Sequence, residues 1–181
     1  MGHVRITGGI HRSRKIAVDD QPGLRPTSDR LREVLFNWLG HDLTGWQVLD
    51  LYAGSGILGF EAASRGAATV TLVDNNRQVI GRLTDHVALL NLDAVDIHQT
   101  TAGNFVRNSG KTYNLIFLDP PFDSDEMSQI SVIIDPLTQA GTLLYREFGT
   151  TQNPEAMDET HWNLIKSKQL GQVKTELWQR K

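Results

Sequence analysis

The sequence predicts an α/β fold in which a mainly parallel β-sheet is covered by helices on both faces. From residue 47 onward, short apolar runs alternate with stretches of helical periodicity, as is typical of parallel strands joined by crossover helices. A glycine-rich turn follows the first of these runs. Near the C-terminus, two further runs flank Leu170-Gly171 and predict an antiparallel hairpin. Five parallel strands and this hairpin together give a seven-stranded sheet.

Length and composition fit one soluble domain with a small appendage. The chain has 181 residues, of which 39% are hydrophobic and 22% are charged. No apolar run approaches the roughly 20 residues that a membrane span needs, and no signal-peptide pattern opens the chain. The chain has no cysteine and its histidines show no metal spacing, so disulfides, thiol nucleophiles and a metal centre are not expected. We expect a cytoplasmic monomer.

The N-terminal segment is expected to form a basic arm. Residues 4–7 and 14–18 are short, partly alternating runs around Gly8-Gly9, which predicts a small β-hairpin. We therefore divide the chain into an arm or hairpin, residues 1–24, and a second domain, residues 25–181. Residues 1–18 carry no acidic side chain although the net charge is −3, and a solvated surface or a nucleic-acid contact would both fit this charge. The expected nucleic-acid contacts of the arm are Arg5, Arg12, Arg14 and Lys15.

The remaining elements follow in order. A helix that Thr27 or Ser28 can cap has one apolar face, formed by Leu31, Val34, Leu35, Trp38 and Leu39. Strands are expected over residues 47–52, 69–74, 95–100, 113–119 and 142–148, and the closing hairpin over 162–169 and 172–179. Further helices are expected from about Ile57 to Gly66, across the segment from Val79 to Leu90, and over about 125–138.

The glycine-rich turn has the spacing of a nucleotide-binding loop. Gly54, Gly56 and Gly59 match G-x-G-x-x-G, and Asp74 lies twenty residues after Gly54 at the end of the next predicted strand. Glycines let the backbone approach a ligand closely, and the helix N-terminus beyond them favours a negative group. An acid in the position of Asp74 can accept hydrogen bonds from ribose hydroxyls. Tight packing of strand against helix would also explain such glycines, and both NAD and S-adenosylmethionine fit the motif.

Asp50 favours S-adenosylmethionine. It lies inside the first predicted parallel strand, four residues before Gly54. A carboxylate there suits a cationic amino group, such as that of the methionine moiety, better than a pyrophosphate. A buried acid that loop amides satisfy would need no ligand at all.

The stretch Asp119-Pro120-Pro121-Phe122 ends an apolar strand abruptly. Proline has no N–H for a sheet ladder, so the strand cannot continue through it. The Asp119 carboxylate and the Pro120 carbonyl would offer two fixed acceptors to an exocyclic amine, and Phe122 could stack on the ring that bears it. Acceptors that fit the amine better as it becomes pyramidal would stabilise the transition state of methyl transfer. A proline-stiffened turn in which Asp119 caps a following helix is the structural alternative.

Together these motifs resemble a Rossmann-like class I S-adenosylmethionine-dependent methyltransferase. More closely, the chain resembles the RsmD family of 16S rRNA guanine-N2 methyltransferases. The segments that carry the likeness are RITGG (5–9), GLRPTSDRLREVLFNWL (23–39), DLYAGSGILGFEAASRGA (50–67) and LDPPF (118–122). The resemblance implies methyl transfer to one guanine of 16S rRNA, guanine 966 in the usual rRNA numbering, in the small ribosomal subunit or a late assembly intermediate.

The resemblance also implies site residues. For the target amine they are Asp119, Pro120, Pro121 and Phe122. For the cofactor they are Thr27, Asp50, Tyr52, Ala53, Gly54, Ser55, Gly56, Asp74, Asn75, Thr101 and Ala102. Thr100-Thr101 stands where such enzymes often place an acidic or amide side chain for the adenine, so Asn75, Thr101 and Ala102 are the candidates for that contact. Arg25 could contact either the cofactor or the RNA.

Other functions share some of these motifs. An adenine-N6 methyltransferase acting on DNA or RNA would use the same Asp-Pro-Pro-aromatic motif. A nicotinamide-dependent oxidoreductase rests on the glycine motif alone, and a non-catalytic RNA-binding module would not need Asp119 beside a nucleotide loop. A carbon-5 pyrimidine methyltransferase is excluded, since it would normally attack through a cysteine and the chain has none.

Overall fold

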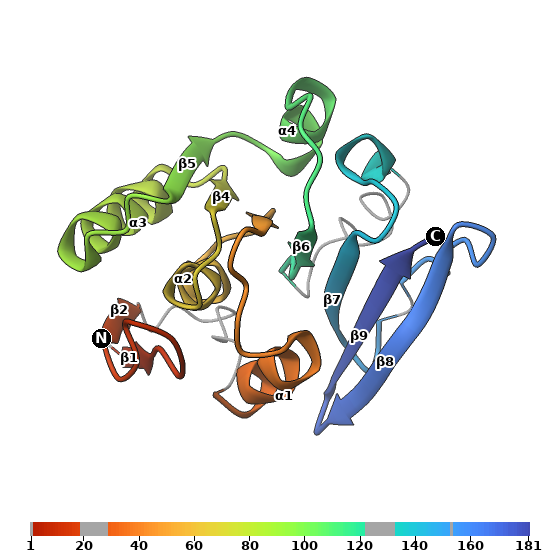
Figure 1. Ribbon diagram of the computed structural model, residues 1–181, viewed down its shortest axis with the longest axis horizontal. Coiled ribbons are helices and arrows are strands. Elements are labelled where there is room, and N and C mark those ends of the chain that lie inside the picture. Colours follow the sequence, from red (N-terminus) through yellow and green to blue (C-terminus); the bar gives the residue numbers. More distant parts are fainter. Residues whose placement is uncertain (1, 19–28, 122–132, 153) are drawn as a thin grey trace.

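The computed structural model describes residues 2–18, 29–121, 133–152 and 154–181. It confirms the seven-stranded, mostly parallel sheet (Figure 1). The strands of this sheet are β3 Gln47–Asp50, β4 Thr69–Asp74, β5 Val95–Gln99, β6 Leu115–Leu118, β7 Leu143–Gly149, β8 Trp162–Leu170 and β9 Val173–Arg180. Their order is β5-β4-β3-β6-β7-β9-β8. Only β9 pairs antiparallel with its neighbours β7 and β8, so the predicted C-terminal hairpin is confirmed as well.

The strand order reverses between β3 and β6. These two strands are parallel neighbours with Asp50 opposite Phe117, although β4 and β5 lie between them in the sequence. Ligands of open α/β sheets bind where the order reverses, outside the carboxyl ends of the strands. The loops after β3 and β6, which carry the two predicted motifs, therefore leave the sheet at the same edge.

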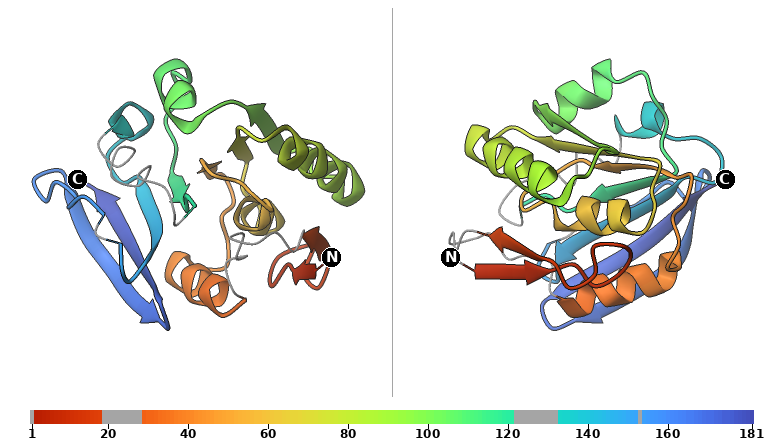
Figure 2. Two further views of the ribbon diagram at one scale, coloured as in Figure 1. Left: turned by 180° about the vertical axis from the view of Figure 1, so that it is seen from behind. Right: turned by 60° about the vertical axis from the view of Figure 1, so that its left-hand side comes forward.

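Helices cover both faces of the sheet (Figures 1 and 2). The described helices are α1 Asp29–Leu39, α2 Ile57–Ser64, α3 Arg77–Leu90, α4 Ala102–Asn108 and the 3-10 turn η1 Asp135–Leu137. On one face, Phe36 of α1 and Phe60 of α2 share a buried cluster with Phe117 of β6. On the other face, Phe105 of α4 packs in a second cluster with Ile116 of β6. None of the helices that the structure describes is long and apolar enough to cross a membrane.

The N-terminal residues form the predicted hairpin. Strands β1 Gly2–Arg5 and β2 Lys15–Val18 pair antiparallel and make a sheet of their own. Ile6 and Ile16 are fully buried in the same cluster as the helices of the first face, so the hairpin shares the core of the larger domain.

Charged side chains hold the hairpin in place. Glu61 of α2 is fully buried and accepts a hydrogen bond from the backbone N–H of Thr7. Arg32 of α1 lies 3.6 Å from Glu61 Oε1, and its Nη2 donates to the Arg5 carbonyl at 2.7 Å. Arg65, which follows α2, lies 3.4 Å from Glu61 Oε2. Two arginines from different elements thus share one buried acid at the base of the arm.

Some expected elements differ from the structure. Helix α4 was not predicted, because in its seven residues only Phe105 and Val106 are large and apolar. The apolar face of α1 was predicted too narrowly, since Arg32 and Phe36 are also buried. Strand β3 ends at Asp50 rather than at Tyr52. The helix expected over about 125–138 falls mainly outside the described residues, and its described end contains η1.

Candidate functional site

The loop after β3 contains two glycines that need the left-handed backbone region. Gly54 has φ of 50° and Gly56 has φ of 77°. A Cβ on Gly56 would also lie 2.5 Å from Leu83 Cδ2, and one on Gly59 would lie 2.3 Å from Leu72 Cδ2. The second and third glycines therefore allow close packing of α2, while the first shapes the turn itself. Packing and ligand approach both contribute to this motif.

Asp74 fixes the same loop from the neighbouring strand. Its Oδ2 accepts a hydrogen bond from Gly54 N at 3.0 Å, and its Oδ1 accepts one from Asn76 N at 2.8 Å. A carboxylate has about four acceptor positions, so two remain for ribose hydroxyls. Asp74 is half-buried, so part of the residue remains accessible.

Asp50 is the most informative side chain of the loop. It is 2% exposed, and its Oδ2 accepts a hydrogen bond from Gly59 N at 3.3 Å. Its Oδ1 is buried and, by distance and angle, has no hydrogen-bond partner among the described residues, although the Tyr52 backbone N–H lies near enough to the carboxylate to oppose the rise in its pKa. Burial raises the pKa of Asp50 to about 7, and the nearby carboxylates of Asp119 and Asp74 add to the increase. A buried acceptor that lacks a donor is suited to an incoming ammonium group, so this residue fits the amino end of S-adenosylmethionine.

The second motif begins directly after β6. Asp119 is half-buried, Pro120 is buried and Pro121 is exposed. Because β3 and β6 are parallel neighbours, the loops after them begin at the same edge of the sheet, and the Asp119 carboxylate lies near enough to Asp50 to raise the pKa of that residue. Three predicted site residues, Arg25, Thr27 and Phe122, lie outside the described residues.

The adenine candidates lie at the same edge of the sheet. Strand β5 pairs with β4 so that Gln99 is opposite Asp74, and the N–H of Thr100 donates to the Asp74 carbonyl at 3.0 Å. Thr101 caps α4, because its Oγ1 accepts from Asn104 N at 3.3 Å. The other predicted cofactor residues share this edge: Asn75 is exposed beside Asp74, Ala102 is buried at the start of α4, and Tyr52, Ala53 and Ser55 lie in the loop after β3.

The predicted RNA contacts lie elsewhere. Arg5, Arg12, Arg14 and Lys15 are all exposed on the N-terminal hairpin. In the described part of the chain, no group of three or more His, Asp and Glu side chains could hold a metal ion.

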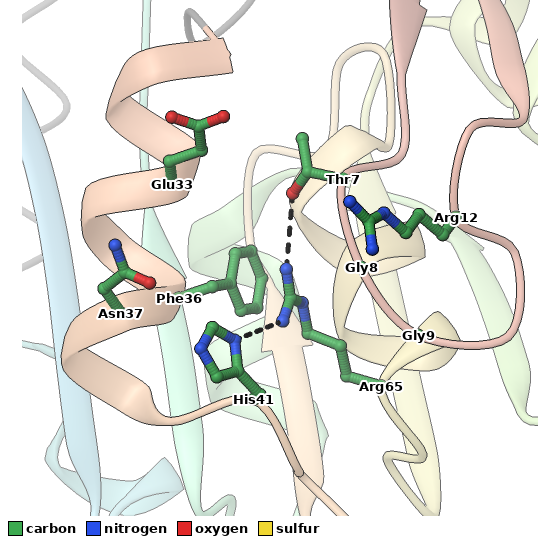
Figure 3. Close-up of a pocket in the computed structure, with 9 residues that line it drawn as sticks. All are labelled: Thr7, Gly8, Gly9, Arg12, Glu33, Phe36, Asn37, His41 and Arg65. Atoms are coloured by element: carbon green, nitrogen blue, oxygen red, sulfur yellow. Dashed lines mark hydrogen bonds between the residues drawn. The ribbon is translucent and has the colours of Figure 1, made fainter.

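A pocket of about 430 Å³ lies where the hairpin meets α1 and the end of α2 (Figure 3). At its centre, the Arg65 guanidinium lies 4.5 Å from the centroid of the Phe36 ring. Arg65 Nη2 donates to Thr7 Oγ1 at 3.3 Å, and its Nη1 lies 3.2 Å from His41 Nδ1. Arg12 extends from the hairpin toward this pocket (Figure 3). The contacts join three segments that are distant in the sequence.

Sequence reasoning missed one residue near Asp119. Glu147 lies in β7, is 4% exposed, and accepts a hydrogen bond from the Tyr145 hydroxyl at 2.9 Å. Burial, and then the Asp119 carboxylate, raise the pKa of Glu147 to about 8. The signal that could have found it was the pair of charged residues, Arg146 and Glu147, inside a strand that is otherwise mainly apolar.

Comparisons with known proteins support the same family. A family model described as Conserved hypothetical protein 95 matches residues 4–179. Ribosomal RNA small subunit methyltransferase D of Escherichia coli (strain K12) is 39% identical over 180 residues, which cover 99% of this chain and 91% of that protein. The protein of the same name from Haemophilus influenzae is 34% identical over 184 residues, which cover 98% of this chain and 94% of that protein.

Solved structures agree with the fold. The Escherichia coli protein yhhF has a TM-score of 0.90 and 36% identity, with 99% of both chains covered. A Haemophilus influenzae structure has a TM-score of 0.83 and 30% identity, again with 99% of both chains covered. A third structure, complexed with SAH, has a TM-score of 0.67 at 15% identity, covers 82% of this chain and 48% of that one, and shows the fold alone. The class I methyltransferase fold is thus confirmed, and the chain belongs to the RsmD family, as the family model and the relatives matched over more than nine-tenths of their length show.

Proposed function

We propose that this protein transfers a methyl group from S-adenosylmethionine to the exocyclic N2 amine of a guanine in the 16S rRNA of the small ribosomal subunit. The observation that carries the proposal is the adjacency of β3 and β6 at one sheet edge, where Asp50, with no hydrogen-bond partner for its Oδ1 among the described residues, ends β3 and Asp119 follows β6. The printed names of the relatives support a small-subunit rRNA substrate. The SAH complex of a protein with the same fold supports the cofactor. The choice of guanine N2 rests on the family resemblance.

The loop after β3 and its neighbours would hold the cofactor. Asp50 Oδ1 would accept from the amino group of the methionine moiety, and the free acceptor positions of Asp74 would bind the ribose hydroxyls. Thr101 and Ala102, at the start of α4, and Asn75 would line the adenine. Bound S-adenosylmethionine supplies an electrophilic methyl group on a sulfonium.

The loop after β6 would hold the amine. In the proposed step the nitrogen lone pair forms the new bond to the methyl carbon, and the electrons of the carbon–sulfur bond remain on sulfur. The amine nitrogen becomes pyramidal and positive, so the Asp119 carboxylate and the Pro120 carbonyl attract it more strongly in the transition state than before. Orientation supplies the rest of the acceleration, and the extra proton leaves the nitrogen afterwards.

The N-terminal hairpin would bind the RNA backbone. Its four basic side chains are exposed, while its backbone is fixed by Glu61 and Arg32. A backbone that is already held in place needs little reorganisation on binding, and phosphate contacts position an RNA without reading its sequence. On this proposal, residues 1–24 act as an RNA-binding arm and residues 25–181 as the methyltransferase domain. Arg12, beside the pocket at Arg65, is the foremost candidate for a phosphate contact.

The test is transfer of a labelled methyl group to small ribosomal subunits that lack the modification, followed by mass spectrometry of the nucleosides. N2-methylguanosine is the expected product. N6-methyladenosine would instead support the adenine-N6 alternative. Calorimetry should show binding of S-adenosylmethionine and no binding of NAD, and the opposite result would favour an oxidoreductase.

A further inference from the structure

Three carboxylates lie at the carboxyl ends of neighbouring parallel strands, on the edge of the sheet that carries the site: Asp50 ends β3, Asp119 directly follows β6, and Glu147 lies near the end of β7. The register places Asp50 opposite Phe117, and Phe117 opposite Tyr145. Asp119 comes two residues after Phe117, just past the end of β6, and Glu147 comes two residues after Tyr145 in β7. A residue that precedes a proline favours an extended backbone, and side chains two residues apart in an extended segment point to the same face. Phe117 and Tyr145 contact edge to face on that side, with ring centroids 6.2 Å apart. Glu147 therefore belongs with Asp119 on the face that α1 covers.

The surroundings of Glu147 are unusual for a buried acid. The Tyr145 hydroxyl donates to its Oε2 at 2.9 Å, and Tyr145 is itself fully buried. In the described ranges, no Lys, Arg or His side chain forms an ion pair with Glu147. Its register partner on β9 is Thr175, which does not titrate.

Glu176 shows the contrast. It is as buried as Glu147, at 4% exposed, but it lies 2.7 Å from Arg146 Nη2 and 2.8 Å from Lys174 Nζ. Arg146 precedes Glu147 in β7 and pairs in register with Glu176 of β9, so both point to the opposite face of the sheet from Glu147. On that face Arg146 contacts Phe148 and Trp178 of the second core cluster. One buried acid of this sheet is thus neutralised by cations, and the other is placed beside a second acid.

A buried carboxylate without a cation is costly, and the cost grows when another carboxylate faces it. The pair then lowers its energy by holding a proton. Burial and the Asp119 carboxylate accordingly raise the pKa of Glu147 to about 8, while the hydrogen bond from Tyr145 acts in the opposite direction. Burial beside a second carboxylate therefore favours the protonated form of Glu147 at neutral pH.

We propose that Glu147 is a positioning residue for Asp119, to whose carboxylate its protonated carboxyl group donates a hydrogen bond. This inference rests on the proposed role of Asp119 as the acceptor for the target amine. A protonated carboxyl has one O–H donor and can still accept from Tyr145, so the order of donation is Tyr145, Glu147, Asp119. This order of donation would fix the orientation of the Asp119 carboxylate. Above the pKa of Glu147 the donor is lost and a second negative charge faces Asp119.

The test compares Glu147→Gln, Glu147→Leu and the control Glu176→Gln, all in the full chain. Turnover and affinity for S-adenosylmethionine are measured from about pH 6 to about pH 9.5. The wild-type kcat should fall as pH rises through about 8. A glutamine amide donates at every pH, so Glu147→Gln should keep kcat within about threefold at pH 7 and lose the fall above pH 8. Leucine has no donor, so Glu147→Leu should lose about tenfold or more in kcat with unchanged cofactor affinity, about 1.4 kcal/mol in barrier height.

Glu176→Gln should keep the wild-type shape of the pH profile, since it removes a buried acid that does not face Asp119. The proposal is overturned if Glu147→Gln retains the alkaline fall, or if Glu147→Leu turns over normally. An Asp119→Ala variant measured alongside separates a failure of the proposed function from a failure of the proposed role of Glu147. Full activity of Asp119→Ala would refute the proposed function of that loop. An inactive Asp119→Ala with normal Glu147 variants would refute only the role of Glu147.

Discussion

Asp50 accepts a hydrogen bond from the backbone N–H of Gly59 through Oδ2, at 3.3 Å, while its buried Oδ1 has no partner in the part of the chain that the structure describes. One oxygen thus anchors the start of α2 and the other remains available. Among the described residues, this is the feature of the glycine loop that packing leaves unexplained. It distinguishes a site for a cationic amino group from a site for a pyrophosphate.

Replacing Asp50 by asparagine tests that distinction. We expect wild-type affinity for S-adenosylmethionine to rise with pH through about 7, where Asp50 ionises, because only the charged form attracts the ammonium group. Asp50→Asn should bind the cofactor about tenfold or more weakly at pH 8 and show no such pH dependence. Titration calorimetry measures both. The exposed Asp93→Asn is the control and should behave like the wild type.

Stability gives the same substitution a second readout. The folded-state pKa of Asp50 lies above its usual value, so its contribution to stability is complete at low pH and is lost as pH rises through about 7. Asp50→Asn removes that loss. The free energy of unfolding in urea, variant minus wild type, should therefore increase from about pH 5 to about pH 8. If this difference stays the same across the range, the raised pKa of Asp50 is contradicted.

Glu61 is the residue on which the arm depends. It accepts from Thr7 N and faces Arg32 and Arg65, all in a buried setting. Glu61→Ala should lower the free energy of unfolding by about 3 to 5 kcal/mol, because two buried cations lose their shared partner. Urea denaturation checks this value. The exposed Asp85→Ala should change stability by less than about 0.5 kcal/mol, and an equal loss in both variants would argue against the anchoring role.

Charge reversal on the arm tests its contact with RNA. The double variant Arg12→Glu, Arg14→Glu should bind small-subunit rRNA more weakly, and the slope of affinity against salt should decrease by about two, because each phosphate contact contributes about one. The same reversal at Lys166 and Lys168, which are exposed on the edge strand β8, is the control. If the arm and control variants respond alike, or if neither changes methylation, the arm is not the RNA contact.

The sequence was most informative where a periodic pattern and a turn signal coincide. The strand β4 was predicted to its exact ends, since a run of β-branched residues follows Gly66 and stops at Asp74. Helix α4 could not be predicted from periodicity, because a seven-residue helix holds barely two turns and shows little amphipathic pattern. Its N-cap Thr101 was singled out only as a cofactor candidate.

The partners of buried charged residues could not be predicted from the sequence either. Arg32 lies on what the sequence indicates is the polar side of α1, and nothing local shows that Glu61 of another helix will meet it. Glu147 likewise depends on which strand lies beside β6. Such partners are set by the order of the strands and helices in space, which a single sequence does not specify. The loop glycines, Asp50, Asp74 and Asp119 were found because their spacing from the strand ends is itself the signal.

The most direct test of the central claim is single-turnover transfer of a labelled methyl group to unmodified small subunits by Asp119→Ala. If Asp119 holds the target amine, the variant should bind S-adenosylmethionine as the wild type does. Its rate of methyl transfer should be at least about a hundredfold lower, in line with the loss of a preorganised acceptor. Transfer at the wild-type rate would show that the loop after β6 does not act on the amine.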